Sequence, residues 1–418
     1  MFVCTSINNE DYVNIVNKKI NTEDFKILSY NVAPMAKKSG IFGEHYFLKI
    51  VVKLENDSIE ELSYFLKTLP QLESQKNFTL EMGAFFKEEQ MFKLFVPLFL
   101  KNEIDNFSKC SPRCYLSQPD TMLIFEDLAI KGYKCLNARQ SYDINLVKLA
   151  IRSMANLHAS SIILEDMKSR NYGKNWRLYD EYPKQFQEML YCQKPPSLAL
   201  IESCVKGTTT QIDYLMGDHF QSKPELQSFK EFSRSSVRDL VKYVRPSEEF
   251  RNTICHGDLW AANIMFKFGK DGDPVDCLLV DFQSYRYCPP AQDLLTFIYL
   301  ATDREFRSNH MQEVLRYYYE EFSHLLAVRG VKNIFDYEEF MASCEANELF
   351  AIIQSVTHFQ IVMMSPDTMT DFLADSEYSR KCMFEDRSDN IIRVCELDKF
   401  YKAKQIESLT DLHEFYRK

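Results

Sequence analysis

The pattern of apolar and polar positions changes about one third of the way along the chain. Before residue 127 the clearest signals are β-type runs, between Ile27 and Val52, at 62–69 (LSYFLKTL) and at 122–125 (MLIF). Short helical patterns accompany them at 11–19 and 78–95. Later, apolar residues recur at helical spacing over 144–160, 176–192, 196–219, 226–244, 291–300, 309–327 and 337–364. We therefore predict an α+β fold with a small β-rich N-lobe (1–127) and a large helix-rich C-lobe (128–418).

Residues 254–281 interrupt this pattern. The polar cluster HGDLWAAN precedes an apolar stub, a turn rich in Gly, Asp and Pro, and a second apolar run that ends in Asp281. This predicts a loop followed by a β-hairpin. Asp258 and Asn263 are five positions apart, and Asp281 lies 23 positions after Asp258. Phosphoryl transfer from ATP uses such a set, because one carboxylate takes the acceptor proton while an amide oxygen and a second carboxylate hold Mg²⁺. A polar turn on a hairpin is the structural alternative.

The pattern HGDLW-x-x-N-I-M-F followed by DFQ resembles the insect ecdysteroid-kinase-like family. This family lies in the choline-kinase-like and aminoglycoside-phosphotransferase branch of the kinase fold. The resemblance implies a protein-kinase-like, two-lobed fold that binds ATP and Mg²⁺. It implies that Asp258 is the catalytic base and that Asn263 and Asp281 hold the metal. His256 is the other catalytic candidate of the motif, and we expect it to brace the loop by hydrogen bonds.

A buried lysine is the main candidate of the N-lobe. Lys67 stands in an apolar β-type run and would be costly to bury without a partner. It is either an edge-strand lysine that faces solvent or the lysine that binds the α- and β-phosphates. Glu88 lies in the helical pattern four residues before Phe92, which is the spacing of the family's lysine-pairing glutamate. We predict a Lys67–Glu88 pair, with Glu89 as the possible substitute.

Two further segments are candidates for nucleotide binding. Residues 37–43 (KKSGIFG) predict a basic turn in which Gly40 and Gly43 let backbone N–H groups lie over phosphates. An ordinary hairpin turn would look alike, and the bulky residues after Gly40 depart from the family pattern. The segment that contains Glu126 and Leu128 resembles the family's link between the lobes, where the backbone meets adenine.

The spacing of the motifs bears on the acceptor. His158, which we expect to be a packed core residue, lies 98 positions before His256, so an insert at about 160–250 is predicted to form extra helices. Such an insert is a natural wall for an acceptor pocket. Only 12 positions separate Asp281 from Asp293, too few for the peptide platform of a protein kinase. This indicates a small-molecule alcohol as acceptor, and Asp293 is expected to orient the catalytic loop.

Charge and composition limit the classes of partner that we expect this chain to bind. A net charge of −10 and a pI near 5.5 argue against nucleic acid and anionic membranes as main partners. The N-terminus lacks a basic segment followed by an apolar one, and 349–364 carries polar residues that suit a buried helix. We expect a cytoplasmic protein with scattered free cysteines and without an obligate protein partner.

Our first hypothesis is an ATP- and Mg²⁺-dependent kinase for an ecdysteroid or a related steroid or phenolic xenobiotic, which suits detoxification. A choline- or ethanolamine-type kinase is the alternative within the class. It would need a cage for a cation, which Trp176, Tyr179, Asp180 and Tyr182 could supply. A nucleotide-binding pseudokinase is the alternative outside the class.

Overall fold

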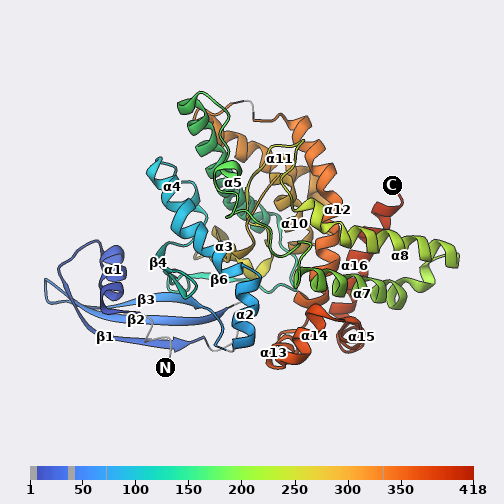
Figure 1. Cartoon of the computed structure of the whole chain (residues 1–418), viewed down its shortest axis with the longest axis horizontal. Coiled ribbons are helices and arrows are strands. Elements are labelled where there is room, and N and C mark those ends of the chain that lie inside the picture. Colours follow the sequence, from blue (N-terminus) through green and yellow to red (C-terminus); the bar gives the residue numbers. More distant parts are fainter. Residues whose placement is uncertain (1–6, 36–42, 72, 333) are drawn as a thin grey trace.

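The computed structural model describes residues 7–35, 43–71, 73–332 and 334–418. An antiparallel sheet occupies one end of the molecule and an assembly of helices the other (Figure 1). The predicted α+β arrangement, β-rich first and helix-rich later, is therefore confirmed. The boundary after residue 127 stays a prediction.

The N-terminal sheet has five antiparallel strands. Their order is β1 (Phe25–Pro34), β2 (Glu44–Leu54), β3 (Ile59–Thr68), β5 (Met122–Glu126) and β4 (Cys114–Gln118). β3 pairs with β2 on one side and with β5 on the other. Lys67 therefore stands in an inner strand, and the edge-strand alternative is wrong.

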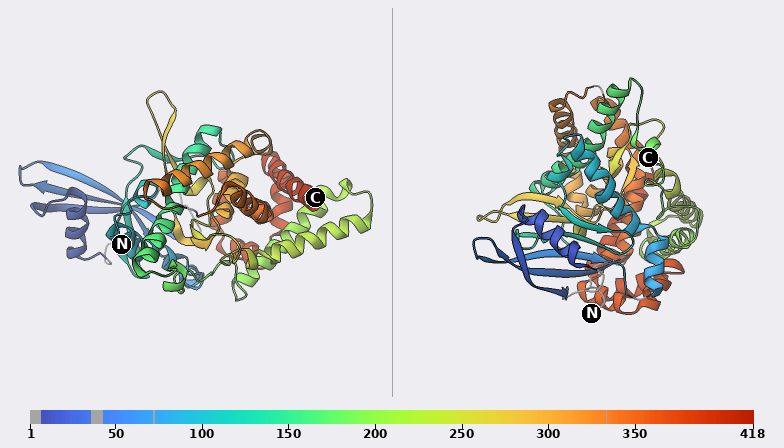
Figure 2. Two further views of the ribbon diagram at one scale, coloured as in Figure 1. Left: turned by 90° about the horizontal axis from the view of Figure 1, so that it is seen from above. Right: turned by 60° about the vertical axis from the view of Figure 1, so that its left-hand side comes forward.

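The two faces of this sheet pack against different partners because side chains alternate along a strand. Leu62, Tyr64 and Leu66 belong to a buried cluster with helix α1 (Asn9–Ile20), which lies across one face (Figure 2). Phe65 packs against the main core of the protein instead. Lys67 shares the Phe65 face by this alternation, so it points toward the helical lobe.

The glutamate helix is segmented rather than continuous. The segments are α2 (Glu73–Glu81), α3 (Ala84–Gln90), a π-helical turn (Met91–Phe95) and α4 (Val96–Lys101). The break after α2 falls at Gly83, whose φ of 61° a side chain rarely adopts. The π-turn precedes Pro97, which has no N–H to continue the α-helical ladder.

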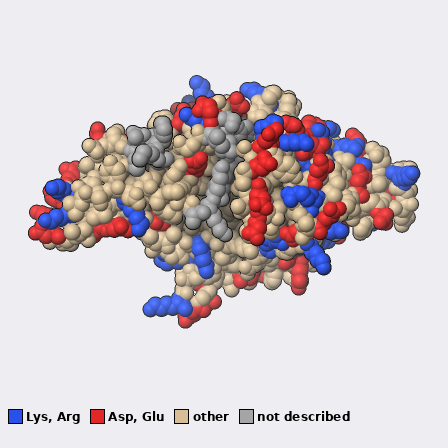
Figure 3. Space-filling view, turned by 90° about the horizontal axis from the view of Figure 1, so that it is seen from below, with Lys and Arg blue, Asp and Glu red and all other residues tan. Residues whose placement is uncertain are grey.

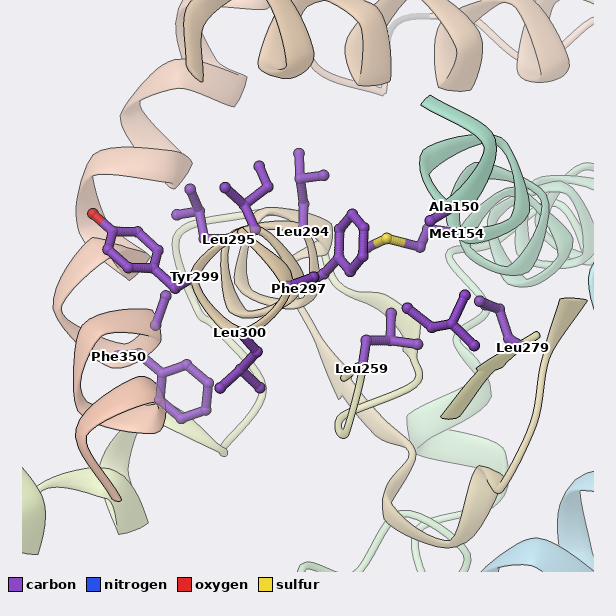
Figure 4. Close-up of a cluster of buried hydrophobic side chains, with 14 of the residues drawn as sticks. Ala150, Met154, Leu259, Leu279, Leu294, Leu295, Phe297, Tyr299, Leu300 and Phe350 are labelled. Atoms are coloured by element: carbon purple, nitrogen blue, oxygen red, sulfur yellow. The ribbon is translucent and has the colours of Figure 1, made fainter. Parts of the chain in front are cut away.

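The C-lobe is built from helices around a buried central one. They are α5 (Ile144–Tyr172), α6 (Leu178–Glu181), α7 (Ser197–Met216), α8 (Lys223–Arg238), α9 (Leu240–Tyr243), α10 (Pro290–Ala301), α11 (Arg304–Val328), α12 (Tyr337–Val362), α13 (Pro366–Ala374), α14 (Ser376–Phe384), α15 (Ser388–Leu397) and α16 (Lys399–Tyr416). Every residue of α10 is buried. Figure 4 shows its side chains directed at α5 and α12, with Leu259 and Leu279 in the same cluster.

The insert differs from its prediction in one segment. Helices α7 and α8 match the patterns at 196–219 and 226–244. The helix expected at 176–192 is wrong, because only Leu178–Glu181 is helical and turns follow. Pro183 explains the stop, since proline disfavours a helical conformation in the residue before it.

Short strands carry the predicted hairpin. β8 (Ile264–Phe268) and β9 (Pro274–Leu279) pair antiparallel, and β6 (Tyr133–Cys135) adds to β8. β7 (Thr253–Cys255) pairs with β10 (Arg286–Cys288). The hairpin prediction is confirmed.

Three surface and chemical features complete the description. On the face in Figure 3, acidic side chains form a row while basic ones are scattered. The cysteines within the described ranges are free thiols. No single helix in the described part of the chain has the length and apolar character to cross a membrane. One bent pair, α12 with α13 at 77°, passes that test by length and composition together.

Candidate active site

The catalytic loop between β7 and β8 is held by a carboxylate of α10. The backbone N–H groups of His256 and Gly257 donate to Asp293 Oδ2 and Oδ1, at 2.7 and 2.9 Å. His158 Nε2 lies 3.1 Å from Asp293 Oδ2, and its Nδ1 lies 2.7 Å from the Tyr318 hydroxyl. Burial opposes ionisation of Asp293, but these hydrogen bonds outweigh it and lower its pKa. His158 is therefore buried, as expected, and also braces the loop.

Glycine is required inside the loop. Gly257 has a φ of +80°, and a Cβ there would lie 2.1 Å from the Ser284 carbonyl oxygen. Its own carbonyl oxygen accepts a hydrogen bond from Arg286 Nη1 at 2.8 Å. The loop is thus packed against the segment that follows Asp281, so the two acidic parts of the site keep a fixed relation.

His256 joins the loop to the end of β9. Its side chain is fully buried, and Nε2 lies 2.9 Å from the Val280 carbonyl oxygen. Its ring packs 4.8 Å, between centroids, from Phe282. These contacts suit the bracing role that we expect, while a catalytic role for His256 stays a prediction.

Asp258 and Asn263 contact each other directly. Asn263 Nδ2 donates to the Asp258 backbone oxygen at 2.8 Å and to its Oδ2 at 3.0 Å. Because the amide nitrogen makes these two hydrogen bonds, the amide oxygen Oδ1 of Asn263 remains as the acceptor atom of this side chain. The Asn263 carbonyl oxygen also accepts the Val280 N–H at 3.0 Å, which ties it to the residue before Asp281. The Asn263 amide oxygen and the Asp281 carboxylate are hard oxygen ligands, which fit Mg²⁺.

Lys67 links the sheet, the glutamate helix and the end of the hairpin. Its Nζ lies 2.5 Å from Glu88 Oε2 and 2.6 Å from Asp281 Oδ1. The Lys67 and Glu88 side chains are only 7% and 2% exposed. Burial disfavours the charged amine, but Asp281 and Glu88 outweigh it and raise the pKa of Lys67. The predicted Lys67–Glu88 pair is present, and Glu88 rather than Glu89 makes it.

Asp281 has a left-handed backbone, with a φ of 68°. Aspartate tolerates this conformation better than most residues, and such strain is typical of functional positions. Its other oxygen, Oδ2, accepts from Gln283 Nε2 at 3.1 Å. The next N–H, that of Phe282, donates to Glu88 Oε1 at 3.1 Å.

The glycine candidates are only partly described. Gly40 lies outside the described residues. Gly43 lies against Lys67, because a Cβ there would meet the Thr68 carbonyl oxygen at 3.2 Å and Lys67 Cε at 3.4 Å. The described part of this turn is thus next to the lysine, and its phosphate-binding role stays a prediction.

Glu126 and Leu128 lie where the five-stranded sheet connects to β6. The Glu126 carboxylate accepts the Arg113 N–H at 3.0 Å and pairs with Lys131. The Leu128 carbonyl oxygen accepts the N–H groups of Lys131 and Tyr133, both at 3.1 Å. These bonds define a compact link between the lobes, and its contact with adenine stays a prediction.

Sequence reasoning missed two groups near the catalytic loop, one that contacts Asp258 and one that binds Arg286. His358, on α12, has its Nε2 3.5 Å from Asp258 Oδ1. Glu188, in the insert, accepts from Arg286 Nε at 2.8 Å. Both come from elements far from the motif. For His358 the available signal was a polar residue in the otherwise apolar stretch 349–364. For Glu188 no local signal distinguishes it from a surface acid.

The residues of the alternative choline cage occupy a different setting. Tyr179 and Asp180 line a cavity of about 430 Å³ together with Arg177 and Arg251. Arg251 and Tyr287 bind Glu165, which is fully buried beside this cavity. The lining also contains Glu249 and Glu339, so carboxylates balance the two guanidinium groups. Trp176 and Tyr182 do not line this cavity, so the four residues do not form one cage.

Comparison with known proteins gives one family and a number of solved structures, of which two follow. The model of the ecdysteroid kinase-like family matches residues 43–330. No curated protein matches the chain. The structure of the GDP and kanamycin complex of APH(2")-IIia is similar, with 12% identity, a TM-score of 0.35, and coverage of 94% of this chain and 98% of that one. The GDP complex of wild-type aminoglycoside 2'-phosphotransferase-IIIa has 9% identity, a TM-score of 0.33, and coverage of 90% and 99%. The family match agrees with the kinase-like, two-lobed fold that the sequence predicts.

Proposed function

Because the chain belongs to the ecdysteroid kinase-like family of small-molecule kinases, we propose that it transfers the γ-phosphate of ATP to a hydroxyl group. The acceptor in this proposal is an ecdysteroid or a related steroid or phenolic xenobiotic. One observation carries it. Lys67, Glu88 and Asp281 form one hydrogen-bonded cluster, and Asp258 and Asn263 form a second, which the Val280 N–H ties to the residue before Asp281.

Each residue has a defined task in this reaction. Lys67, held by Glu88, places a fixed positive charge where the α- and β-phosphates bind. Mg²⁺, when held by Asn263 and Asp281, neutralises charge on the phosphates. Asp258 takes the proton of the acceptor hydroxyl. Burial raises its pKa, but His358, His256 and Arg286 outweigh burial and lower it, so the base stays ionised at neutral pH.

The transition state of phosphoryl transfer is loose, and it needs alignment and charge neutralisation more than a strong base. A base with a low pKa is therefore compatible with catalysis, provided that its geometry is fixed. Asn263 fixes one oxygen of Asp258 from within the loop. The Asp293 carboxylate holds the loop in place by accepting hydrogen bonds from two of its backbone N–H groups.

The segment after Asp281 supports a small acceptor. Three residues, Phe282–Ser284, separate Asp281 from the ordered turn into β10 (Arg286–Cys288). The insert lies directly against it, since the Tyr285 hydroxyl donates to the Gln185 carbonyl oxygen at 2.8 Å. We propose that the segment between α6 and α7, rather than helices α7 and α8, is the wall of the acceptor pocket.

The setting of the protein is part of the proposal. Its net charge of −10 and the acidic row in Figure 3 support a cytoplasmic enzyme that binds neither nucleic acid nor membranes and has no obligate protein partner. Trp176 and Tyr182 do not line the cavity that contains Tyr179 and Asp180, which disfavours the choline-type alternative.

A coupled ATP-turnover screen with Mg²⁺ tests this function. The panel contains ecdysteroids, plant phenolics, choline and aminoglycosides, with the Asp258→Asn variant as the blank. We expect turnover with a steroid or phenol that is absent in the variant. Turnover with choline alone would overturn the acceptor class. If no member of the panel is phosphorylated although Mg²⁺–ATP still binds, the pseudokinase alternative is favoured.

A further inference from the structure

We propose that His358 is a positioning residue for Asp258 and, with Gln354 and Tyr191, forms a subsite for the uncharged hydroxyl end of the acceptor. This inference rests on the proposed kinase function and deepens it. It assigns a role to α12, which contains none of the motif residues.

The contacts of His358 fix the orientation of its ring. Nδ1 lies 3.1 Å from the Gln354 carbonyl oxygen, and Nε2 lies 3.5 Å from Asp258 Oδ1. The first contact lies within one turn of α12, and the second reaches across to the catalytic loop. The helix backbone thus orients the ring, and the ring directs Nε2 at the base.

The position of the pair suits contact with substrate. The side chains of His358 and Asp258 are each 20% exposed, whereas His256 and Asp293 are almost completely buried. Asn263 holds Oδ2 of Asp258 from one side, and His358 faces Oδ1 from the other. Together they fix the plane of the carboxylate, which determines the direction in which it takes a proton.

Gln354 supplies a further donor one helical turn before His358. Its side chain is buried, and its Oε1 accepts from the Tyr191 hydroxyl at 3.3 Å. Its Nε2 is buried without a hydrogen-bond partner in the described part of the chain. Buried amide N–H groups are rarely left unpaired, so an oxygen of the acceptor is a suitable partner. The Arg286 guanidinium lies 5.4 Å from the centre of the Tyr191 ring and donates to the Gly257 carbonyl oxygen, which places this group near the loop that contains the base.

The charge around Asp258 selects the acceptor. Against the effect of burial, His358, His256 and Arg286 hold the pKa of this one carboxylate low, so its negative charge is partly compensated before substrate arrives. A quaternary ammonium bound beside the hydroxyl would find no free anion there. A neutral alcohol, such as a steroid or phenol, needs none.

Steady-state kinetics with ecdysone and choline as probes test the role. We expect His358→Gln to lower kcat on ecdysone by on the order of tenfold, with KM for ATP unchanged, because the base loses its orientation. His358→Lys, which provides an N–H donor toward Asp258, should recover part of the loss. His358→Gln should also lower the ratio of kcat/KM for ecdysone to kcat/KM for choline. The matched control is His310→Gln, since His310 lies in an exposed ion pair with Glu313 on α11. An unchanged kcat in His358→Gln would overturn the proposal.

A spectroscopic measurement separates this proposal from the proposed function. ¹⁵N-histidine NMR at pH 7, with the His358 signals identified by their loss in His358→Gln, reports both ring nitrogens without turnover. We expect the Nε2 signal of His358 to change in Asp258→Asn more than its Nδ1 signal, because only Nε2 faces the base. An unchanged Nε2 signal would overturn the inference even if ecdysone is a substrate. A changed Nε2 signal would support the pair even if another acceptor is found.

Discussion

The phosphate side and the acceptor side of the site are built differently. On the phosphate side, Lys67, Glu88 and Asp281 form a buried ion network, and all three belong to recognisable patterns in the sequence. On the acceptor side, His358 and Glu188 come from α12 and from an irregular part of the insert. Every ATP carries the same phosphates, whereas acceptors differ. In the proposed reaction, the phosphates of ATP thus contact motif residues, and the acceptor contacts residues outside any motif.

Asp258 is where the two sides meet, and its replacement should have the largest effect. Asp258→Asn should reduce kcat by about 10³-fold, because general-base assistance is lost while the loop geometry is kept. Calorimetry should show Mg²⁺–ATP binding within a few fold of the wild type. A large loss of ATP affinity would mean that Asp258 serves the phosphate side as well.

The phosphate side should depend on buried charge. Lys67→Ala should lower the free energy of unfolding by about 3–5 kcal/mol, since it leaves two carboxylates without their cation. Urea denaturation measures this. The matched control is Lys49→Ala, on the next strand, whose pair with Glu61 is half exposed and should change stability little. Equal effects of the two variants would contradict a buried network.

The acceptor side contains a comparable buried ion pair, Glu188 with Arg286, whose contribution to stability should depend on pH. Burial alone would raise the pKa of Glu188, but Arg286 and Lys87 outweigh it and lower this pKa to about 2. A lowered folded-state pKa gives stability that is present above the unfolded value near 4.5 and lost as the pH falls toward 2. Glu188→Gln should therefore cost about 3 kcal/mol at pH 7. The difference in the free energy of unfolding between variant and wild type should shrink as the pH falls from about 5 to 2.

The variant with the smallest expected effect should be more stable than the wild type. Lys87 is buried over the Tyr285 ring, at 4.9 Å, and burial lowers its pKa to about 8 despite Glu188. A base with a lowered folded-state pKa destabilises the fold at pH values below it. Lys87→Met should raise the free energy of unfolding by about 1–2 kcal/mol at pH 7 and by less as the pH rises above 8. Lys93→Met, an exposed neighbour, is the control, and a destabilised Lys87→Met would show that the amine is paired.

Local signals carried most of the fold prediction. Alternation in 62–69 placed Lys67 in a strand, and the Gly-Asp-Pro turn placed the hairpin before Asp281. The prediction at 176–192 failed because apolar spacing there packs turns rather than a helix, with Pro183 as the interruption. The helix expected at 78–95 is divided because Gly83 and Pro97 act on the backbone more strongly than the apolar spacing does.

The site was predictable where a residue's neighbours are set by its own element. Glu88 could be chosen because it stands four residues before Phe92, which is the spacing of the family's lysine-pairing glutamate. His358 could not, because its contact with Asp258 joins residues 100 positions apart, and nothing in either segment determines how α12 packs beside the loop. Contacts between distant segments follow from tertiary packing, which a single sequence does not encode in any local pattern.

The arrangement of the first strands has a practical consequence. The family match begins at residue 43, after both α1 and β1. A fragment trimmed to that match would lose the strand that pairs with β2 along most of its length, and the helix that covers the apolar side chains of β2 and β3. It would present unpaired backbone groups next to a bare hydrophobic surface. Such a fragment is expected to self-associate through β2, so preparations meant for assay need the first 42 residues.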